Sequence, residues 1–167
     1  MKTFTHLPAG SRVWIYQADR SFSAAESAAI DIAVTEFASQ WSSHKEKVVG
    51  DGGLLYNRFV VLVADEDQLQ IGGCSIDGTV RFIKELGAKY KVDFFDRFFT
   101  CYWNNDQIAG EDFNSFKAKL SQGLISNDTI VFNNLITTLE GLQTKWQVPL
   151  SQSWHSKFLS HNTSLKL

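Results

Sequence analysis

Short apolar runs and amphipathic segments follow one another along the first two thirds of the chain. In Arg12–Ala18, aromatic and β-branched residues are concentrated, as on a pleated and largely buried surface, which predicts a strand. Arg58–Ala64 is apolar without alternation, which predicts a strand covered on both faces. A short strand is predicted at Gln68–Gly72 and a ring-rich one at Phe94–Trp103. Because neighbouring charged residues interrupt this last stretch, we expect it at an edge of the sheet.

Two helices are predicted between these strands. Ser23–Glu26 has the spacing of a capping box, and apolar residues recur after it at helical spacing as far as Trp41. Ser75 is placed to begin the second helix, whose apolar stripe ends at Gly87. The stretch His44–Tyr56 holds several glycines and charges and is predicted to be a mobile loop.

The resulting order is strand, helix, strand, strand, helix, strand, which is the order of a ferredoxin-like βαββαβ unit. In that fold the helices lie on one face of an antiparallel sheet, and we expect Arg12–Ala18 and Arg58–Ala64 to run parallel. We expect the C-terminal third to supply further helices that pack on the open face of the sheet. These helices are predicted at Glu111–Gln122, Leu135–Trp146 and Ser153–Leu159. Without a linker or repeat, residues 1–167 are predicted to form a single α+β domain.

Composition narrows the class of protein. The 167 residues are 44% hydrophobic and carry a formal net charge of −2, so the chain can build a core but lacks the positive charge of a general nucleic-acid binder. The longest apolar run, Phe59–Ala64, is far shorter than a membrane-spanning helix. Met1–Gly10 shows no signal-peptide core, and 2 cysteines cannot form a disulfide framework. We therefore expect a cytoplasmic protein with neither nucleic acid nor a membrane as partner.

Several segments of the chain resemble a known family. They are Ser11–Gln17, Tyr56–Phe59, Gly73–Asp77, Val131–Leu135 and Ser153–His155. In these segments, and over nearly the whole chain, the sequence is similar to that of a small bacterial family of about this length, whose members are often described as "ABC transporter ATPase". The resemblance implies membership of that family, and it supplies no catalytic residues.

The description as an ATPase can be tested against the sequence. ATP hydrolysis in such proteins needs a loop of the form G-x-x-x-x-G-K-[ST], whose amides and lysine hold the phosphates. The chain contains no Gly-Lys dipeptide, and the glycines of Gly50–Gly53 flank an acidic residue. Leu120–Leu124 is only loosely similar to the transporter signature L-S-G-G-Q and is predicted to be a helix end. The sequence therefore argues against ATPase activity, and no cofactor is predicted.

The most site-like segment is Gly72–Asp77, which passes from a predicted strand into a predicted helix. A thiol at Cys74 would lie beside unpaired amides at a helix N-terminus, which favours the thiolate and can hold an anion. In the ferredoxin-like sheet, Arg12 and Arg58 would begin two parallel strands at the edge that also carries Cys74. The sequence therefore predicts one positive pocket at this edge.

Other side chains extend this predicted site. Ser75, Asp77 and Arg81 complete the anion site, and His155 is the histidine best placed to act as a general base for Cys74. The alternative remains open, because a cysteine before a helix is more commonly a small buried residue, and Ser75 and Asp77 are ordinary first-turn residues. No histidine pair has zinc-site spacing and no C-x-x-C motif occurs, so no metal site is predicted.

Two functions follow from these residues. The first is a non-catalytic domain that binds a protein partner or a small anionic ligand, with the ring-rich Phe94–Trp103 strand as a partner or homodimer surface. The second is a thiol-dependent enzyme or anion-binding site centred on Cys74 with Arg58. The exposure of Cys74 separates the two, because a nucleophilic thiol must be reachable by its substrate.

Overall fold

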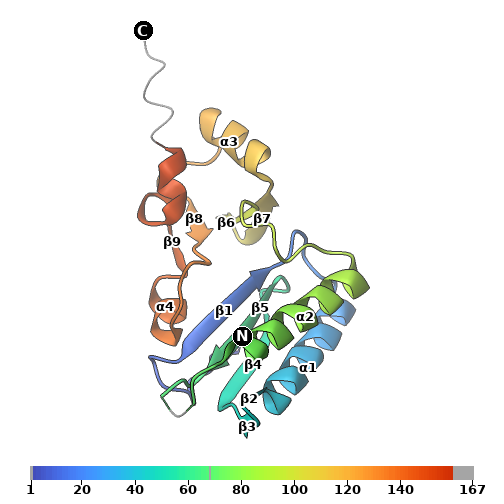
Figure 1. Cartoon of the computed structure of the whole chain (residues 1–167). Helices are drawn as coiled ribbons and strands as arrows, with labels where there is room; N and C mark the ends of the chain where they lie inside the picture. Colours follow the sequence, from blue (N-terminus) through green and yellow to red (C-terminus); the bar gives the residue numbers. More distant parts are fainter. Residues whose placement is uncertain (1, 68, 160–167) are drawn as a thin grey trace. The chain divides into compact units, whose positions relative to one another are not determined.

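The computed structural model describes residues 2–67 and 69–159 of the chain. Within these residues the protein is a mixed α+β structure with antiparallel sheets, as predicted (Figure 1). It divides into two compact units. The first comprises residues up to Phe95 together with Thr137–Gln143, and the second comprises Asp96–Ile136 and the residues from Thr144 onward. The single domain over residues 1–167 stays a prediction.

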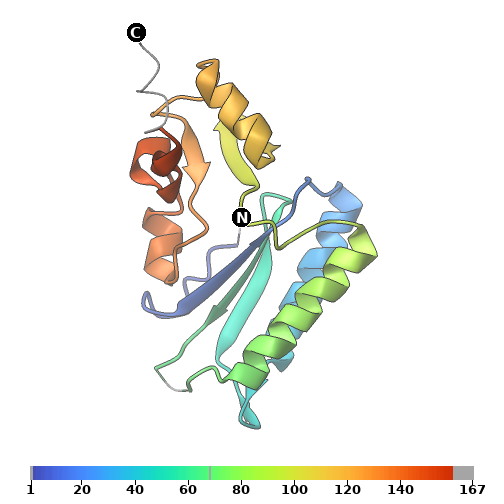
Figure 2. The same ribbon diagram turned by 45° about the horizontal axis from the view of Figure 1, so that its top comes forward.

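The first unit is a three-stranded antiparallel sheet with two helices on one face (Figures 1 and 2). The central strand is buried along its whole length, as its unbroken apolar run predicts. The strands in spatial order are β1 (Arg12–Gln17), β5 (Phe59–Ala64) and β4 (Gly50–Leu55). The helices are α1 (Ala24–Gln40) and α2 (Gly73–Tyr90), and a hairpin of β2 (Ser42–Ser43) and β3 (Glu46–Lys47) follows α1.

α1 begins at the predicted capping box. The Ser23 hydroxyl accepts a hydrogen bond from the Glu26 amide, and the Glu26 carboxylate accepts one from the Ser23 amide. Arg20 lies 2.8 Å from the same carboxylate, and this hydrogen bond lowers the pKa of Glu26 to about 2. Further along, Ile30 and Val34 are fully buried, one helical turn apart. The cap therefore fixes where the helix starts, and the apolar stripe fixes which side it buries.

The ends of α2 differ from the prediction. The helix begins earlier, with Gly72 as its N-cap, so that Ser75 lies inside the first turn. It ends later, at Tyr90, and its C-cap Lys91 adopts the left-handed conformation with φ of 55°. Gly87 is an interior position, and a Cβ there would lie 2.9 Å from the Val92 carbonyl oxygen. The glycine allows a close approach of the following chain and does not stop the helix.

The strand pairing contradicts the predicted sheet. β1 and β5 are antiparallel, with Arg12 opposite Ala64 and Gln17 opposite Phe59. The predicted strand at 68–72 is not formed at the described residues 69–72. The second strand of the three-stranded sheet along the chain is instead β4, within the segment predicted to be a loop, and it forms a tight hairpin with β5. A ferredoxin-like arrangement is therefore not confirmed.

β4 was not predicted as a strand, because the glycines that suggest a loop serve here to let other groups pack closely. A Cβ at Gly52 would lie 2.7 Å from Leu62 Cδ2 and 3.0 Å from Val34 Cγ1. Glycine therefore lets α1 approach the strand closely. A cluster of glycines is typical of a loop, whereas in this protein the same residues mark close contact between a helix and a strand.

The second unit is a four-stranded antiparallel sheet with one α-helix. The strands in spatial order are β7 (Gln107–Glu111), β6 (Thr100–Asn104), β8 (Ile130–Phe132) and β9 (Gln147–Pro149). The helical segments are α3 (Phe113–Ser121) and the 3₁₀-helices η1 (Leu150–Gln152) and η2 (Trp154–Phe158). α3 matches the helix predicted at Glu111–Gln122, and its C-terminal stop at Gly123 has φ of 72°.

The predicted edge strand Phe94–Trp103 is wrong in two respects. Its first part forms turns, in which Asp93 and Asp96 carboxylates accept hydrogen bonds from the amides of Phe95 and Phe98. Its second part is β6, which pairs with β7 on one side and β8 on the other. The charged residues therefore mark turns and not an exposed strand edge.

The predicted C-terminal helices fall into different units. Most of α4 (Leu139–Thr144) belongs to the first unit, where the Val13 amide donates to the Thr137 carbonyl and the Leu139 amide to the Ser11 carbonyl. α3 and η2 belong to the second unit. Within the described part of the chain, no helix has the length and apolarity that a membrane crossing requires.

Candidate functional sites

The predicted positive pocket is not formed, because the two arginines lie at opposite ends of β5. Arg12 is opposite Ala64, at the end of the strand, whereas Arg58 precedes its first residue. Arg12 is instead linked through Glu66 to the segment that precedes α2. Glu66 Oε1 accepts hydrogen bonds from Arg12 Nη1 at 3.2 Å and from the Ile71 amide at 3.1 Å. Because β1 and β5 are antiparallel, Arg12 lies near the start of α2, and Arg58 lies at the opposite end of the sheet.

Arg58 is a buried residue of the turn between β4 and β5. It is 7% exposed, and its Nη2 donates to Ser21 Oγ at 2.9 Å. Its carbonyl accepts a hydrogen bond from the Ala18 amide at 3.0 Å. These contacts tie the turn to the segment that precedes α1, which gives Arg58 a structural role.

The beginning of α2 carries an exposed thiol. Cys74 is the second residue of the helix, behind a Gly72 N-cap that has no side chain to bind the first amides. Ser75, predicted as a ligand of the same site, is buried, and its hydroxyl accepts a hydrogen bond from Trp41 Nε1 at 2.7 Å. At the start of α2, Cys74 is therefore exposed to solvent, whereas Ser75 is buried and hydrogen-bonded in the core.

His44 lies against this helix start, although the sequence did not place it there. A Cβ at Gly72 would lie 2.6 Å from His44 Nε2, so the glycine lets the exposed imidazole lie close to the N-cap. His44 and Lys45 form the turn between β2 and β3, with φ of 52° and 69°. Ser43 Oγ accepts a hydrogen bond from the Gly72 amide and ties the hairpin to α2. The sequence signal for this close approach is Gly72, whereas a Cβ at Gly73 would meet no neighbouring atom.

Arg12 is held near the same region by aromatic side chains. Its guanidinium lies 4.7 Å from the centroid of the Trp14 ring. Trp14 meets Trp41 edge to face at 5.3 Å, and Trp41 is the donor to Ser75. The Arg12 guanidinium is therefore held by two side chains of the first unit, Trp14 and Glu66.

Asp77 and Arg81 share the outer face of α2, as their spacing predicts. With neighbours on the same stripe they line a shallow hollow of about 510 Å³. Its lining is Asp77, Val80, Arg81, Lys84, Glu85 and Ala88. Neither Cys74 nor Ser75 takes part in this hollow, so the predicted anion site is divided between two places.

His155 belongs to the core of the second unit. It is 2% exposed, its ring stacks on Trp154 at 4.1 Å, and burial lowers its pKa to about 4. Its Nδ1 lies 2.9 Å from Ser153 Oγ, which itself donates to the Leu150 carbonyl. The hydroxyl therefore accepts the proton of Nδ1, and the imidazole is neutral. Cys74 lies in the first unit, so the couple of Cys74 with His155 stays a prediction.

A continuous group of aromatic rings lies partly exposed on the second unit. Phe98 is 57% exposed and contacts Phe113 at 5.5 Å between ring centroids. Phe113 contacts Phe158 at 5.2 Å, and Phe158 contacts Trp154 at 5.6 Å. The fully buried Phe116 contacts Phe158 from the core. We call Phe98, Phe113, Trp154 and Phe158 the aromatic strip.

The charged residues next to the aromatic strip are not equally available. Asp112 and Asp96 accept hydrogen bonds from nearby backbone amides, and the Ser115 hydroxyl lowers the pKa of Asp112. Lys117 Nζ lies 5.3 Å from the Phe113 ring, and Lys157 precedes Phe158. Both lysines are exposed, and neither forms an ion pair with any residue that the structure describes. The charged side chains beside the strip are therefore two carboxylates bonded to backbone amides and two lysines that form no ion pair with a described residue.

No described part of the chain gathers three or more His, Cys, Asp or Glu side chains that could hold a metal ion. Comparison of the chain with protein-family models, with curated proteins and with solved structures finds no match.

Proposed function

We propose that the protein is a non-catalytic binding domain that holds an acidic, apolar segment of a partner protein on its aromatic strip. The observation that carries this proposal is the unbroken series of ring contacts from Phe98 to Trp154, which is partly open to solvent. Aromatic residues are enriched in protein interfaces, and contiguous exposed apolar surface commonly marks a binding site. A partner would remove this surface from water.

The strip has the physical properties of a binding surface. Its rings rest on Phe116 and on one another, so they lose little conformational freedom when a partner binds. Burying an exposed phenylalanine such as Phe98 contributes about 2 kcal/mol. Lys117 and Lys157, which lack acidic partners among the described residues, favour a segment that carries Asp or Glu beside its apolar side chains.

Selection from a random peptide library displayed on phage tests this proposal. We expect enriched peptides that combine aromatic or aliphatic residues with Asp or Glu. Their affinity should fall about tenfold or more in Phe98→Ser and in Lys117→Glu. Leu124→Ser is the matched control, because Leu124 is a 69% exposed apolar residue of the same unit outside the strip. Undiminished binding to Phe98→Ser would overturn the proposal.

Sedimentation of the purified protein distinguishes a second copy of the chain from a different partner. A dimer that dissociates in Phe98→Ser, but not in Leu124→Ser, would assign the strip to self-association and so contradict binding of an acidic partner. A protein whose association state is the same in both variants supports the proposal.

A separate observation supports a second function, a thiol-dependent enzyme or an anion-binding site at the start of α2. Cys74 is exposed at the second helical position, and the imidazole of His44 lies against the N-cap of the same helix. The positive end of the helix dipole favours a thiolate or a bound anion, and an imidazole N–H beside it can donate a hydrogen bond to either. In this version of the site His44 replaces Arg58.

The rate of alkylation by iodoacetamide tests the second function. The buried Cys101 serves as the internal control. We expect Cys74 to react faster than free cysteine at neutral pH, and more slowly in His44→Gln. Cys74→Ser should remove the fast reaction. A rate equal to that of free cysteine, unchanged in His44→Gln, would exclude this function.

A cytoplasmic location and membership of the small bacterial family that the sequence resembles are part of the same proposal. ATP hydrolysis is not, because the sequence lacks the Gly-Lys pair of a phosphate-binding loop.

A further inference from the structure

β4 lies at an edge of the sheet of the first unit, and an exposed edge strand can pair with another chain. In an antiparallel sheet, alternate residues of an edge strand direct their amides and carbonyls outward. In β4 the outward residues include Gly52 and Leu54. The odd-numbered positions bond inward instead, since the Val49 carbonyl accepts from the Asp65 amide and the Leu55 carbonyl accepts from the Arg58 amide. An unprotected edge would leave the backbone groups of Gly52 and Leu54 open to a strand.

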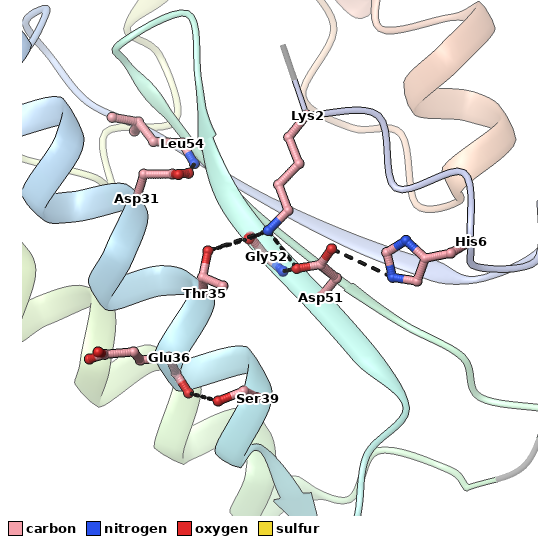
Figure 3. A network of polar contacts seen from close by, with 9 residues as sticks. All are labelled: Lys2, His6, Asp31, Thr35, Glu36, Ser39, Asp51, Gly52 and Leu54. Atoms are coloured by element: carbon pink, nitrogen blue, oxygen red, sulfur yellow. Dashed lines mark hydrogen bonds and ion pairs between the residues drawn. The ribbon is translucent and has the colours of Figure 1, made fainter.

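Side chains already occupy these outward groups (Figure 3). The Leu54 amide donates to Asp31 Oδ1 at 2.8 Å, and the Gly52 amide donates to Asp51 Oδ1 at 2.7 Å. The Gly52 carbonyl accepts a hydrogen bond from Thr35 Oγ1 at 3.2 Å and a second one from Lys2 Nζ. Asp31 and Thr35 lie one turn apart on α1, so a single helix face supplies two of these contacts.

Lys2 completes this arrangement from the N-terminal segment. Its ammonium group also contacts Asp51 Oδ1 at 2.6 Å and Thr35 Oγ1 at 3.3 Å, which uses all three of its protons. Its aliphatic chain passes Gly53, where a Cβ would lie 2.9 Å from Lys2 Cδ. His6 lies 3.5 Å from the other oxygen of Asp51. The N-terminal segment is thus fixed along β4 at two points.

We propose that Lys2, Asp31 and Thr35 form an edge lock, which keeps β4 from pairing with a strand of a second copy of the chain. The lock acts because strand addition requires the Gly52 carbonyl and the Leu54 amide, and both are bonded within the unit. The glycines of β4 leave few side chains in the way of an incoming strand, so protection must come from bonded groups and not from bulk. This device is independent of the aromatic strip.

Removing the lock tests the proposal. We expect Lys2→Ala/Asp31→Ala/Thr35→Val to self-associate in sedimentation experiments, at protein concentrations where the wild type does not, and also in a Phe98→Ser background. Ser39→Ala is the matched control, because Ser39 lies on α1 and bonds only to the Glu36 carbonyl. The control should behave as the wild type does. A folded triple variant that associates no more than the wild type would overturn the proposal.

Hydrogen exchange provides a second measurement that milder variants also permit. In Asp31→Ala the Leu54 amide loses its acceptor and should exchange about tenfold faster or more. In Lys2→Ala, Asp51 loses its ammonium partner, and the Gly52 amide should exchange faster, whereas Lys2→Arg keeps the charge and should change it less. Unchanged exchange at both amides would show that these side chains do not protect the edge.

Discussion

The two units bury apolar surface in different ways. In the first, β5 and the inner faces of α1 and α2 bury mostly aliphatic residues, so the core is spread over many side chains. In the second, one group of buried rings surrounds Phe116, which contacts Tyr102, His155 and Phe158, and another joins Phe132 to Trp146. The comparison shows that one chain can combine a mostly aliphatic core with one that is rich in aromatic rings.

The units also differ in where they keep ionisable groups. The first unit holds Glu26 and Asp51 at a helix cap and a strand edge, each next to a cation. The second unit also pairs a carboxylate with a cation, at Glu111 and Lys119, but in addition it buries His155 without a charged partner. Burial lowers the pKa of His155, whereas the hydrogen bond from Arg20 lowers the pKa of Glu26. Acid should therefore weaken the units in different pH ranges.

The largest expected effect is that of Phe116→Ala. Loss of this ring leaves a cavity in a small core and should lower the free energy of unfolding of the second unit by about 3–5 kcal/mol. Ile30→Val in the first unit should cost about 1 kcal/mol. Hydrogen exchange measured residue by residue gives the local stability of each unit. Similar losses in the two units would remove the contrast between their cores.

The second expected effect is the loss of stability of the second unit in mild acid. The pKa of His155 falls from 6.5 to about 4 on folding, so the unfolded chain binds the proton first. Stability is therefore full above pH 6.5 and declines as the pH falls toward 4, by up to about 3 kcal/mol. In the first unit, the depressed pKa of Glu26 supports stability above pH 4.5 that is lost as the pH falls toward 2.

Urea unfolding at several pH values measures this difference. His155→Gln should remove the decline of the second unit between pH 6.5 and 4 and leave the behaviour of the first unit unchanged. If the wild-type second unit keeps its stability down to pH 4, the contrast in ionisable groups is wrong.

A smaller effect is expected for Trp41→Phe in the first unit. The change removes the indole donor and leaves the buried Ser75 hydroxyl without this partner, which should cost about 1–2 kcal/mol. Adding Ser75→Ala should recover part of the loss, because both partners are then apolar. A double-mutant cycle by urea unfolding measures the coupling, and additive losses would show that the hydrogen bond does not stabilise the first unit.

The smallest effect is that of Ser23→Ala at the start of α1. Loss of the cap should destabilise the first unit by about 1 kcal/mol, because one amide of the first turn loses its acceptor. Asp112→Ala removes the corresponding cap of α3 and should act on the second unit alone. Thermal unfolding monitored separately in the two units tests whether the loss of each cap lowers the stability of its own unit alone.

Several elements could be predicted because their signals are local. The capping box at Ser23 and the glycine stop at Gly123 each depend on a few neighbouring residues. The buried strand Phe59–Ala64 follows from an unbroken apolar run. The exposure of Cys74 and the burial of His155 could not be predicted, because both depend on which distant residues cover them.

The sheet shows how one missed strand changes the whole arrangement. Without β4, the chain passes from α1 directly to β5, and β5 is then expected to run parallel to β1. With β4 in place, the crossover leads to β4, and the tight turn after Leu55 returns β5 between β1 and β4, antiparallel to both. Arg12 and Arg58 are separated for this reason alone.

The sequence by itself determined which segments are apolar, where α1 begins, where α3 ends, and that Cys74 precedes or opens a helix. These properties depend on residues within a few positions of one another. The tertiary structure alone decided the pairing of β1 with β5, the approach of His44 to Gly72 and the contacts of Lys2 with β4. They depend on residues far apart in the chain, which meet only through tertiary packing and which no local pattern brings together.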